Sequence, residues 1–315
     1  MKIVFFGTPE FAVASLDRLV EAGYEIAAVV TMPDRTGGRG NKVIESDVKK
    51  YAVARNLKLL QPEKLRAEEF LNELRSLEAD LFIVIAFRML PKVVWEMPRL
   101  GTFNLHASLL PQLRGAAPIN HAIINGLNQT GVTTFLINEE IDKGKILLNA
   151  TLQIGENEDA GSLHDRLMAL GADLTLETVG RLEKGSVEAK PQPEVETLLP
   201  APKIFKHDCF IDFGKGTVEI HNKVRGLSPY PGGWARLRTA DGKEMEVKIH
   251  QTSKEIDLPE KPELKPGEAF TKGNRFYAGT ADGIIEILSL QPAGKRRMTA
   301  EAFLAGHRPE CFLQA

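Results

Sequence analysis

The 315-residue sequence is short of cysteine, of long apolar runs and of net charge. Its two cysteines, Cys209 and Cys311, lie far apart without the spacing of a metal site, and we interpret both as structural thiols. No apolar run approaches the roughly 18 residues that a membrane span needs, and the N-terminus shows no signal-peptide pattern. These absences exclude a disulfide scaffold and a membrane protein, and we expect a cytoplasmic protein.

The formal net charge of −2 argues against a protein coated in basic residues for binding nucleic acid. This average conceals an asymmetry. Lys and Arg outnumber Asp and Glu from Lys203 onward, whereas acidic residues prevail before it. The C-terminal third is therefore a weak candidate for contact with a polyanion.

The sequence also lacks the G-x-G-x-x-G motif of dinucleotide-binding folds. Its first apolar run, KIVFFG at 2–7, ends in the single Gly7. Thr8 and Pro9 then predict a helix N-cap followed by Pro at the first helical position. An NAD-dependent dehydrogenase thus loses its main support in the sequence.

Short apolar runs alternate with helical patterns in the first half of the chain. The runs at 2–7 and 25–31 flank a helical pattern that ends at Gly23, and 79–87 is a continuous apolar run typical of a strand covered on both faces. This alternation predicts an α/β fold with a Rossmann-like, doubly wound and mostly parallel sheet.

The second half has a different pattern. Residues 159–185 predict one long helix, broken or offset near Gly171, and four prolines then stiffen a connection. The short alternating strands that follow, with ADG turns at 240–242 and 281–283, predict a small OB-like β-barrel. We therefore divide the chain into a catalytic domain (1–188), a linker (189–205) and a C-terminal domain (206–315).

A polar loop, MPDRTGGRGNK at 32–42, follows the second predicted strand and is longer than a connection requires. It contains Arg35, Arg39 and Lys42. Two interpretations stay open for it. The loop either reaches over a cleft to bind phosphate or is an ordinary surface loop.

The run FNLH places two polar side chains in an apolar strand. Because side chains alternate along a strand, Asn104 and His106 point the same way. Burying them without partners costs roughly 1 to 3 kcal/mol for each group. Parallel sheets avoid this cost at the carboxyl ends of their strands, where open α/β sheets bind ligands. We therefore favour a crevice over a hydrogen-bonded core for this pair.

Two further residues are candidates for the same crevice. Arg114, in RGAAP, is either a clamp for its loop or a substrate ligand, and we favour the clamp. Asp142 lies in an acidic turn between two predicted strands, where neighbouring carboxylates prevent spacing from singling it out. An amide, an imidazole and a carboxylate together can stabilise an oxyanion and move protons.

Two blocks of the sequence carry a resemblance to a known family. NLHASLLPQLRGAAPI (104–119) resembles the signature of the folate-dependent formyltransferases, and GVTTFLINEEIDKGKIL (131–147) resembles their second block. Within that superfamily, FFGTPEFA, PDRTGGRG and SLQPAGKRRMTAEAFLAG resemble the methionyl-tRNA formyltransferases. The resemblance covers nearly the whole chain, including the predicted barrel.

The resemblance implies transfer of the formyl group of 10-formyltetrahydrofolate to the α-amine of methionine on initiator tRNA, in translation initiation and without a metal. Asn104, His106 and Asp142 match the catalytic residues of the family. The folate co-substrate is expected beside Phe87, Arg88, Ser108, Leu109, Leu110 and Pro111. The tRNA is expected to contact Arg35, Arg39, Lys42, Lys203, Lys295, Arg296 and Arg297.

The sequence departs from the family pattern at AFRMLP, where Arg88 stands in a segment that usually reads AYG. That segment borders the folate, so details of its pocket are expected to differ. Other folate-dependent N-formyltransferases, acting on a sugar amine or glycinamide ribonucleotide, and a formyl-folate hydrolase remain alternatives, as does a tRNA-binding protein without catalysis. The Arg39 loop and the basic barrel argue against the enzyme alternatives, and we expect a monomer.

Overall fold

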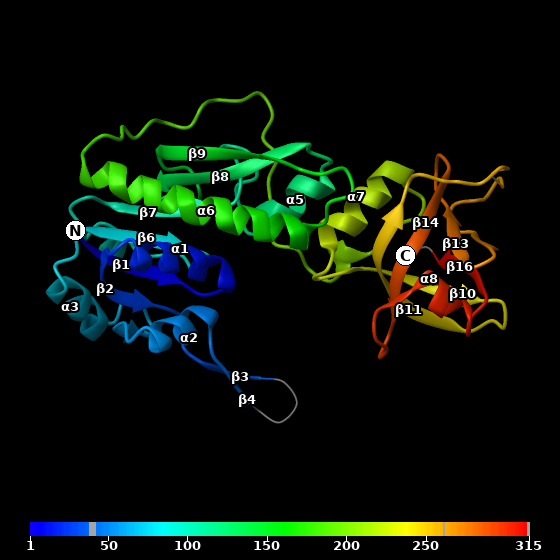
Figure 1. Ribbon diagram of the computed structural model, residues 1–315, viewed down its shortest axis with the longest axis horizontal. Helices are drawn as coiled ribbons and strands as arrows, with labels where there is room; N and C mark the ends of the chain where they lie inside the picture. The colour runs from blue at the N-terminus through cyan, green and yellow to red at the C-terminus, as the bar shows by residue number, and fades with distance from the viewer. Residues whose placement is uncertain (38–41, 261, 314–315) are drawn as a thin grey trace. The chain divides into compact units, whose positions relative to one another are not determined.

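The computed structural model describes residues 1–37, 42–260 and 262–313 (Figure 1). The chain forms two compact units. The first contains Met1–Gly115, Thr130–Leu152 and Asp165–Pro200, and the second contains Ala116–Gln129, Gln153–His164 and Ala201–Ala315. Within the described ranges, we find no helix that combines the length and the apolar character needed to cross a membrane.

A seven-stranded sheet forms the centre of the first unit. Its strands, in spatial order, are β5 (Leu59–Leu60), β2 (Glu25–Val30), β1 (Lys2–Gly7), β6 (Leu81–Ile85), β7 (Thr102–His106), β8 (Gln129–Leu136) and β9 (Ile146–Gln153). The strands from β5 to β7 pair in parallel, and β8 runs antiparallel to β7. The predicted Rossmann-like, mostly parallel sheet is confirmed.

Helices cover both faces of this sheet (Figure 1). They are α1 (Glu10–Glu21), α2 (Asp47–Ala54), α3 (Glu68–Ser76), α4 (Lys92–Trp95) and α6 (Ala160–Glu183). Phe6, Phe82 and Val84 bury their side chains with those of α3 and α4 on one face. Val84 pairs with Asn104 in the parallel ladder, so Asn104 and His106 point to this same face.

Leu105 points to the opposite face and packs against α6. A Cβ added at Gly171 would lie 2.7 Å from Leu105 Cδ2, so the absence of a side chain lets the helix approach the strand closely. The predicted break near Gly171 is therefore wrong. Helix α6 is continuous from Ala160 to Glu183, and its glycine serves packing rather than interruption. The predicted N-cap at Thr8 is also one residue early, since Pro9 caps α1.

Two short strands, β3 (Arg35–Gly37) and β4 (Lys42–Ile44), pair antiparallel in the polar loop after β2. They form a separate two-stranded sheet. The loop predicted from its polarity thus contains regular structure on each side of the residues that are not described.

The second unit contains a nearly closed antiparallel barrel, as predicted. Its main sheet has the order β12 (Ala269–Lys272), β13 (Arg275–Gly279), β14 (Ile284–Pro292), β11 (Glu244–Ser253), β10 (Gly233–Thr239) and β16 (Pro309–Leu313), and β15 (Met298–Thr299) pairs with β14. A bridge between Glu268 and Cys311 joins the two ends of this sheet. The helices of the unit are α5 (Pro118–Ile124), α7 (Thr217–Leu227) and α8 (Ala300–Leu304), with a 3-10 turn at His207–Cys209.

Aromatic and aliphatic side chains fill the barrel. Phe276 and Phe303 stack at 6.2 Å, and Phe213 stacks on Phe312 at 4.2 Å. Cys209 is buried in the same core as a free thiol, and burial raises its pKa. A buried, protonated thiol is unreactive, which agrees with its interpretation as a structural residue.

Gly171→Val is expected to lower the free energy of unfolding by about 1 to 3 kcal/mol, because the new side chain overpacks the contact between α6 and β7. Gly180→Val is a matched control in the same helix, since a Cβ there meets the Tyr24 hydroxyl at an ordinary distance of 3.6 Å. Urea unfolding followed by circular dichroism measures both variants. Equal losses would contradict this explanation of the glycine.

Candidate active site

The candidate site begins at the carboxyl end of β7, where the sheet presents its two polar residues. Asn104 is half-buried, and His106 is buried with 6% of its surface exposed. Among the residues that the structure describes, none forms a hydrogen bond with the Asn104 side-chain amide. This amide therefore has its hydrogen-bonding capacity available for a ligand.

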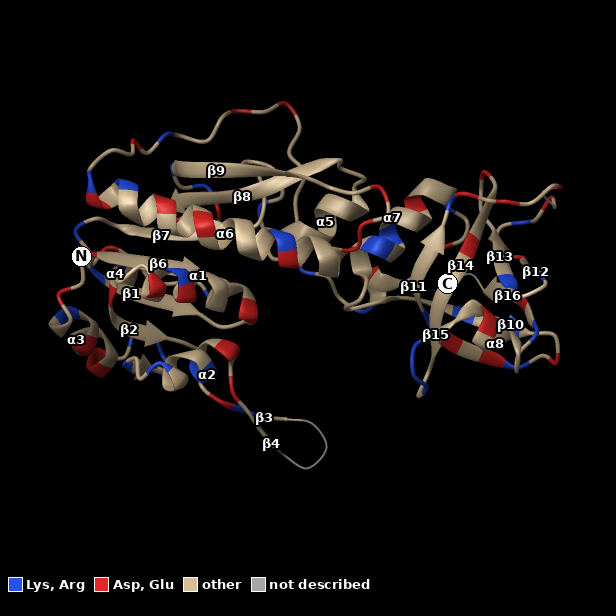
Figure 2. Ribbon diagram, viewed as in Figure 1, with Lys and Arg blue, Asp and Glu red and all other residues tan. Residues whose placement is uncertain are grey.

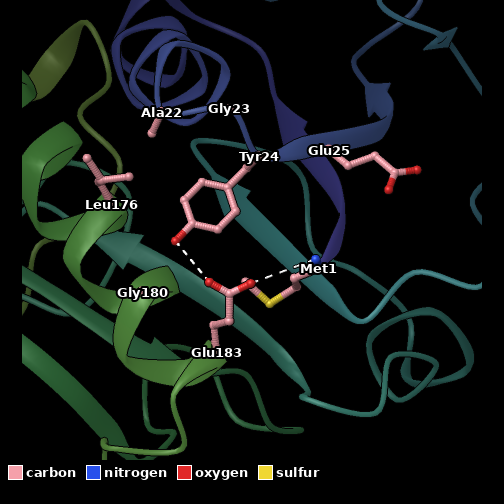
Figure 3. Close-up of a pocket in the computed structure, with 8 residues that line it drawn as sticks. All are labelled: Met1, Ala22, Gly23, Tyr24, Glu25, Leu176, Gly180 and Glu183. Atoms are coloured by element: carbon pink, nitrogen blue, oxygen red, sulfur yellow. Dashed lines mark hydrogen bonds and ion pairs between the residues drawn. The ribbon is translucent and has the colours of Figure 1, made fainter.

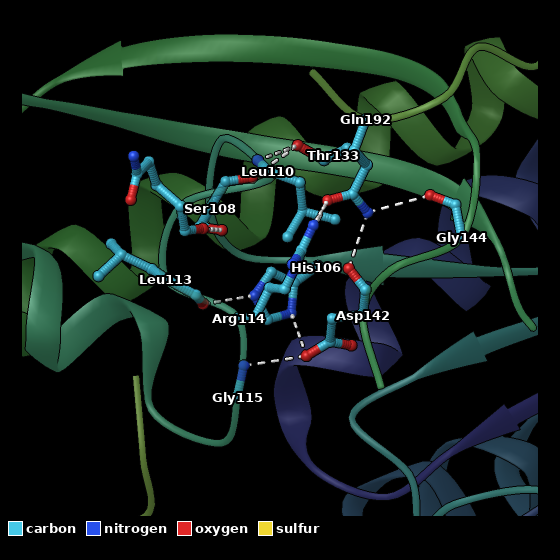
Figure 4. Close-up of polar contacts among 11 residues, drawn as sticks. His106, Ser108, Leu110, Leu113, Arg114, Gly115, Thr133, Asp142, Gly144 and Gln192 are labelled. Atoms are coloured by element: carbon cyan, nitrogen blue, oxygen red, sulfur yellow. Dashed lines mark hydrogen bonds and ion pairs between the residues drawn. The ribbon is translucent and has the colours of Figure 1, made fainter. Parts of the chain in front are cut away.

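A backbone carbonyl orients the imidazole of His106. The ring atom Nε2 lies 2.8 Å from the Leu113 oxygen (Figure 4). Because a carbonyl only accepts, Nε2 carries the hydrogen, and the neutral ring has its lone pair on Nδ1. Leu113 itself has a φ of 60°, which turns its carbonyl toward the ring, and its N–H donates to the Leu199 oxygen at 2.7 Å.

Asp142 completes the group from the turn between β8 and β9. Its Oδ2 lies 3.9 Å from His106 Nδ1 and accepts a hydrogen bond from the Gly115 N–H at 2.9 Å. The distance to Nδ1 is too long for a hydrogen bond and suits an ion pair once the ring is protonated. The structure thus brings Asn104, His106 and Asp142 into one region of the first unit.

The turn that carries Asp142 is tightly constrained. Asp142 has a φ of 53°, in the left-handed region that non-glycine residues rarely adopt. Two residues later, a Cβ on Gly144 would lie 1.6 Å from the Leu136 oxygen, so only glycine fits. Both backbone carbonyls accept from the Gln192 side chain, at 2.7 Å for Asp142 and 3.0 Å for Gly144.

Arg114 acts as a clamp, as we favoured. Its Nη2 and Nε both donate to Gln192 Oε1, at 2.6 Å and 3.2 Å (Figure 4). Sequence reasoning missed Gln192 altogether, because it lies between two prolines in the segment predicted as a linker. It also missed the role of the Leu113 carbonyl, which no side-chain pattern could reveal.

The segment expected to contact folate directly follows His106 in the chain. Thr133 pairs with His106 across β7 and β8, and its hydroxyl donates to the Ser108 oxygen at 2.7 Å and accepts from the Leu110 N–H at 3.2 Å. Ser108 and Leu110 are thereby fixed, with the apolar Leu109 and Pro111 beside them. Ser108, Leu110 and Pro111 are buried and Leu109 is half-buried.

The Arg88 side chain points to the segment that follows β5. Its guanidinium donates to the backbone oxygens of Pro62 and Glu63, and it lies over the Phe87 ring at 5.7 Å. Burial lowers the pKa of this guanidinium. Phe87 in turn contacts Phe6 edge to face, with ring centroids 5.7 Å apart. The departure from the family pattern therefore holds a neighbouring loop in place.

The residues expected to contact tRNA are distributed over both units. Arg35 is exposed on β3, whereas Arg39 and the side chain of Lys42 lie outside the described residues. Lys203 is exposed, with its amine 5.4 Å from the Phe205 ring centre. Exposed basic residues also occupy the turn before β15 (Figure 2), and these are Lys295, Arg296 and Arg297.

A cavity of about 580 Å³ lies at the N-terminal ends of β1 and β2 in the first sheet (Figure 3). It is lined by Met1 and by Tyr24, whose hydroxyl donates to Glu183 at 3.4 Å. Burial and the Glu183 carboxylate raise the pKa of Tyr24. Met1 precedes β1, at the N-terminal ends of the parallel strands, whereas His106 is the last residue of β7, at their C-terminal ends. This cavity is therefore separate from the polar group around His106.

Comparison with known proteins identifies the class to which this fold and site belong. Residues 1–179 match the model of the formyl transferase family, and residues 203–308 match that of the formyl transferase C-terminal domain. The chain belongs to the formyl transferase family.

Its similar relatives are more particular. It is 52% identical over 314 residues to a methionyl-tRNA formyltransferase of Phocaeicola vulgatus, with 98% of this chain and 96% of the relative covered. It is 49% identical over 317 residues to a protein of the same name from Bacteroides fragilis, with 99% and 97% covered. The resemblance found in the sequence is confirmed.

Solved structures show the same fold at low sequence identity. HypX from Aquifex aeolicus superposes with a TM-score of 0.65 at 20% identity, covering 98% of this chain and 48% of that one. An N-formyltransferase from Helicobacter canadensis, in complex with folinic acid and dTDP-3-aminofucose, gives a TM-score of 0.64 at 20% identity, covering 93% and 99%.

Gly144→Ala is expected to displace the Asp142 turn, because its Cβ would collide with the Leu136 oxygen. We expect formyl transfer to slow by roughly 10- to 100-fold, as misplaced catalytic groups commonly cause. Gly306→Ala is the control, since a Cβ there meets no atom of the described residues within 4 Å. Initial rates and thermal unfolding are measured together, and an unchanged rate in Gly144→Ala would contradict the constraint on this turn.

Proposed function

We propose that this enzyme transfers the formyl group of 10-formyltetrahydrofolate to the α-amine of methionine on initiator methionyl-tRNA, giving N-formylmethionyl-tRNA for translation initiation. The observation that carries the proposal is the convergence of Asn104, His106 and Asp142 in a chain that shares about half its residues with methionyl-tRNA formyltransferases over nearly its full length. The sugar N-formyltransferases share its fold at only about 20% identity. This likeness therefore gives no support for a sugar as the substrate.

The reaction exchanges one carbon–nitrogen bond for another. The uncharged amine attacks the formyl carbon, the formyl oxygen becomes an oxyanion, and the bond to the folate nitrogen then breaks. Asn104 stabilises the oxyanion by donating a hydrogen bond from its available amide. This interaction is stronger in the transition state than with the ground-state carbonyl, so it accelerates the chemical step.

His106 and Asp142 handle the proton that the amine loses. Because the Nε2 hydrogen of His106 is held by the Leu113 carbonyl, Nδ1 is the atom that receives the proton. The Asp142 carboxylate accepts a hydrogen bond from the attacking amine and stabilises the imidazolium that forms 3.9 Å away. The same proton then passes to the departing folate nitrogen, so the transfer is balanced.

The co-substrate is assigned to the segment that follows His106 and to the residues after β6. Leu109 is half-buried and Ser108, Leu110 and Pro111 are buried behind it, and Phe87 and Arg88 complete the proposed contacts. Folate supplies the activated formyl group, and these residues of the chain orient it toward Asn104.

The basic residues supply affinity for the tRNA phosphates. Contacts from Lys and Arg to phosphate strengthen binding without selecting a sequence. We assign this role to Arg35, Arg39, Lys42, Lys203, Lys295, Arg296 and Arg297. In this arrangement residues 1–188 form the catalytic domain, 189–205 form the linker and 206–315 form the tRNA-binding domain. Arg35, Arg39, Lys42 and Lys203 add tRNA contacts from the first two segments. We propose a monomer that acts in the cytoplasm.

The direct test is incubation with 10-formyltetrahydrofolate labelled in the formyl group and either initiator or elongator methionyl-tRNA. We expect label on the methionine of the initiator tRNA, with at least tenfold less on the elongator. Uncharged initiator tRNA is the control for the acceptor amine. Label on neither charged tRNA would overturn the proposed substrate, and release of free formate would favour a hydrolase.

Asn104→Ala is expected to lower kcat by about 100- to 1000-fold, because the oxyanion loses its side-chain donor. Binding of methionyl-tRNA, measured by filter retention without folate, is expected to remain within about twofold, since the amide acts on the reacting carbonyl. An equally large loss of tRNA affinity would show that Asn104 binds the substrate and does not stabilise the transition state.

A further inference from the structure

We propose that Gln192, in the segment 190–199 that is here called the strap, is a positioning residue for catalysis. This inference rests on the proposed function, because it assigns to Gln192 the task of holding Asp142. The strap follows α6 and lies in the segment that the sequence predicts as a linker.

The Gln192 amide joins the two loops of the site. Its nitrogen donates to the Asp142 and Gly144 carbonyls at 2.7 Å and 3.0 Å, and its oxygen accepts two hydrogen bonds from the Arg114 guanidinium. Arg114 precedes Gly115, whose N–H holds the Asp142 carboxylate. Gln192 thus fixes the backbone of the Asp142 turn, and the Gly115 N–H fixes the Asp142 side chain. Through Arg114, Gln192 also links the two loops (Figure 4).

The turn requires such a restraint. Aspartate adopts the left-handed region more readily than most non-glycine residues, but such conformations persist where surrounding contacts determine them. Asp142 is in that region, with a φ of 53°. The two bonds from Gln192 to the carbonyls of this turn are contacts of that kind. Without them, the Gly115 N–H still holds the carboxylate, but the backbone of the Asp142 turn loses two of its hydrogen bonds.

The strap is anchored on both sides of Gln192. Before it, Lys190 and Ile146 exchange two backbone hydrogen bonds, at 2.7 Å and 2.9 Å. After it, Gln112 donates to the Thr197 oxygen at 2.9 Å and accepts from the Leu199 N–H at 2.8 Å. These anchors keep the strap in place independently of Gln192. A substitution at Gln192 therefore tests the link to Asp142 more than the attachment of the strap.

Only an amide satisfies this position. The site presents two acceptors, the carbonyls of Asp142 and Gly144, and one cationic donor group, that of Arg114. Glutamate is nearly isosteric and still accepts from Arg114, but it has no hydrogen to donate and places a carboxylate against two carbonyl oxygens. Gln192→Glu therefore keeps the hydrogen bonds from Arg114 and removes those to the Asp142 and Gly144 carbonyls.

The first experiment compares Gln192→Ala and Gln192→Glu with the wild type in formyl transfer to initiator methionyl-tRNA. We expect kcat to fall by roughly 10- to 100-fold in both variants, with KM for the tRNA changed by less than about threefold. Glu194→Ala, at an exposed position of the strap, is the matched control and is expected to keep the wild-type kcat. Thermal unfolding verifies that each variant is folded. Wild-type kcat in Gln192→Glu would overturn the inference.

A double-mutant cycle with Asp142→Asn shows whether Gln192 acts through Asp142. If it does, the double variant Gln192→Ala/Asp142→Asn has a kcat within about threefold of that of Asp142→Asn alone. Full additivity of the two losses overturns the inference about Gln192 and leaves the proposed function intact. Wild-type kcat in Asp142→Asn alone overturns the catalytic role of Asp142, and the inference fails with it.

Discussion

The hydrogen bond between His106 and the Leu113 carbonyl is the contact on which the rest of the site depends. It engages the Nε2 hydrogen and leaves the lone pair of the neutral ring on Nδ1, the atom to which the proposed mechanism assigns the proton. The Asp142 carboxylate lies 3.9 Å from this Nδ1, so its effect on the ring depends on which nitrogen carries the hydrogen. The left-handed conformation of Leu113 and its bond to Leu199 thus help to orient the His106 imidazole, although neither involves a polar side chain.

The sheet makes this arrangement possible through its pairing. Alternation along β7 places Leu105 against Gly171 of α6 and leaves Asn104 and His106 on the other face. Close packing behind the strand therefore fixes the polar residues in front of it. The antiparallel partner β8 adds Thr133, which holds the loop beside His106. Strand β7 thus connects the packing of the core to the positions of Asn104 and His106.

The parts of the structure that follow from local patterns could be predicted from the sequence. Apolar runs and helical spacing indicated the mostly parallel sheet and the barrel, and alternation placed Asn104 and His106 on one side. Asp142 could not be singled out, because neighbouring turn carboxylates have the same pattern and only the fold distinguishes them. Gln192 was missed for a related reason, since its partners are distant backbone carbonyls. Gly171 was misread because a glycine needed for close packing looks the same in sequence as one that interrupts a helix.

The strap also bears on where the catalytic part of the chain ends. The match to the N-terminal family model stops at residue 179, and α6 ends at Glu183, so both sequence similarity and secondary structure suggest a boundary there. Gln192 and Leu199 lie beyond it, yet they support Asp142 and Leu113. A fragment cut at that boundary would keep Asn104, His106 and Asp142 while losing the groups that align them. The first compact unit accordingly extends to Pro200, past the end of the family match at residue 179.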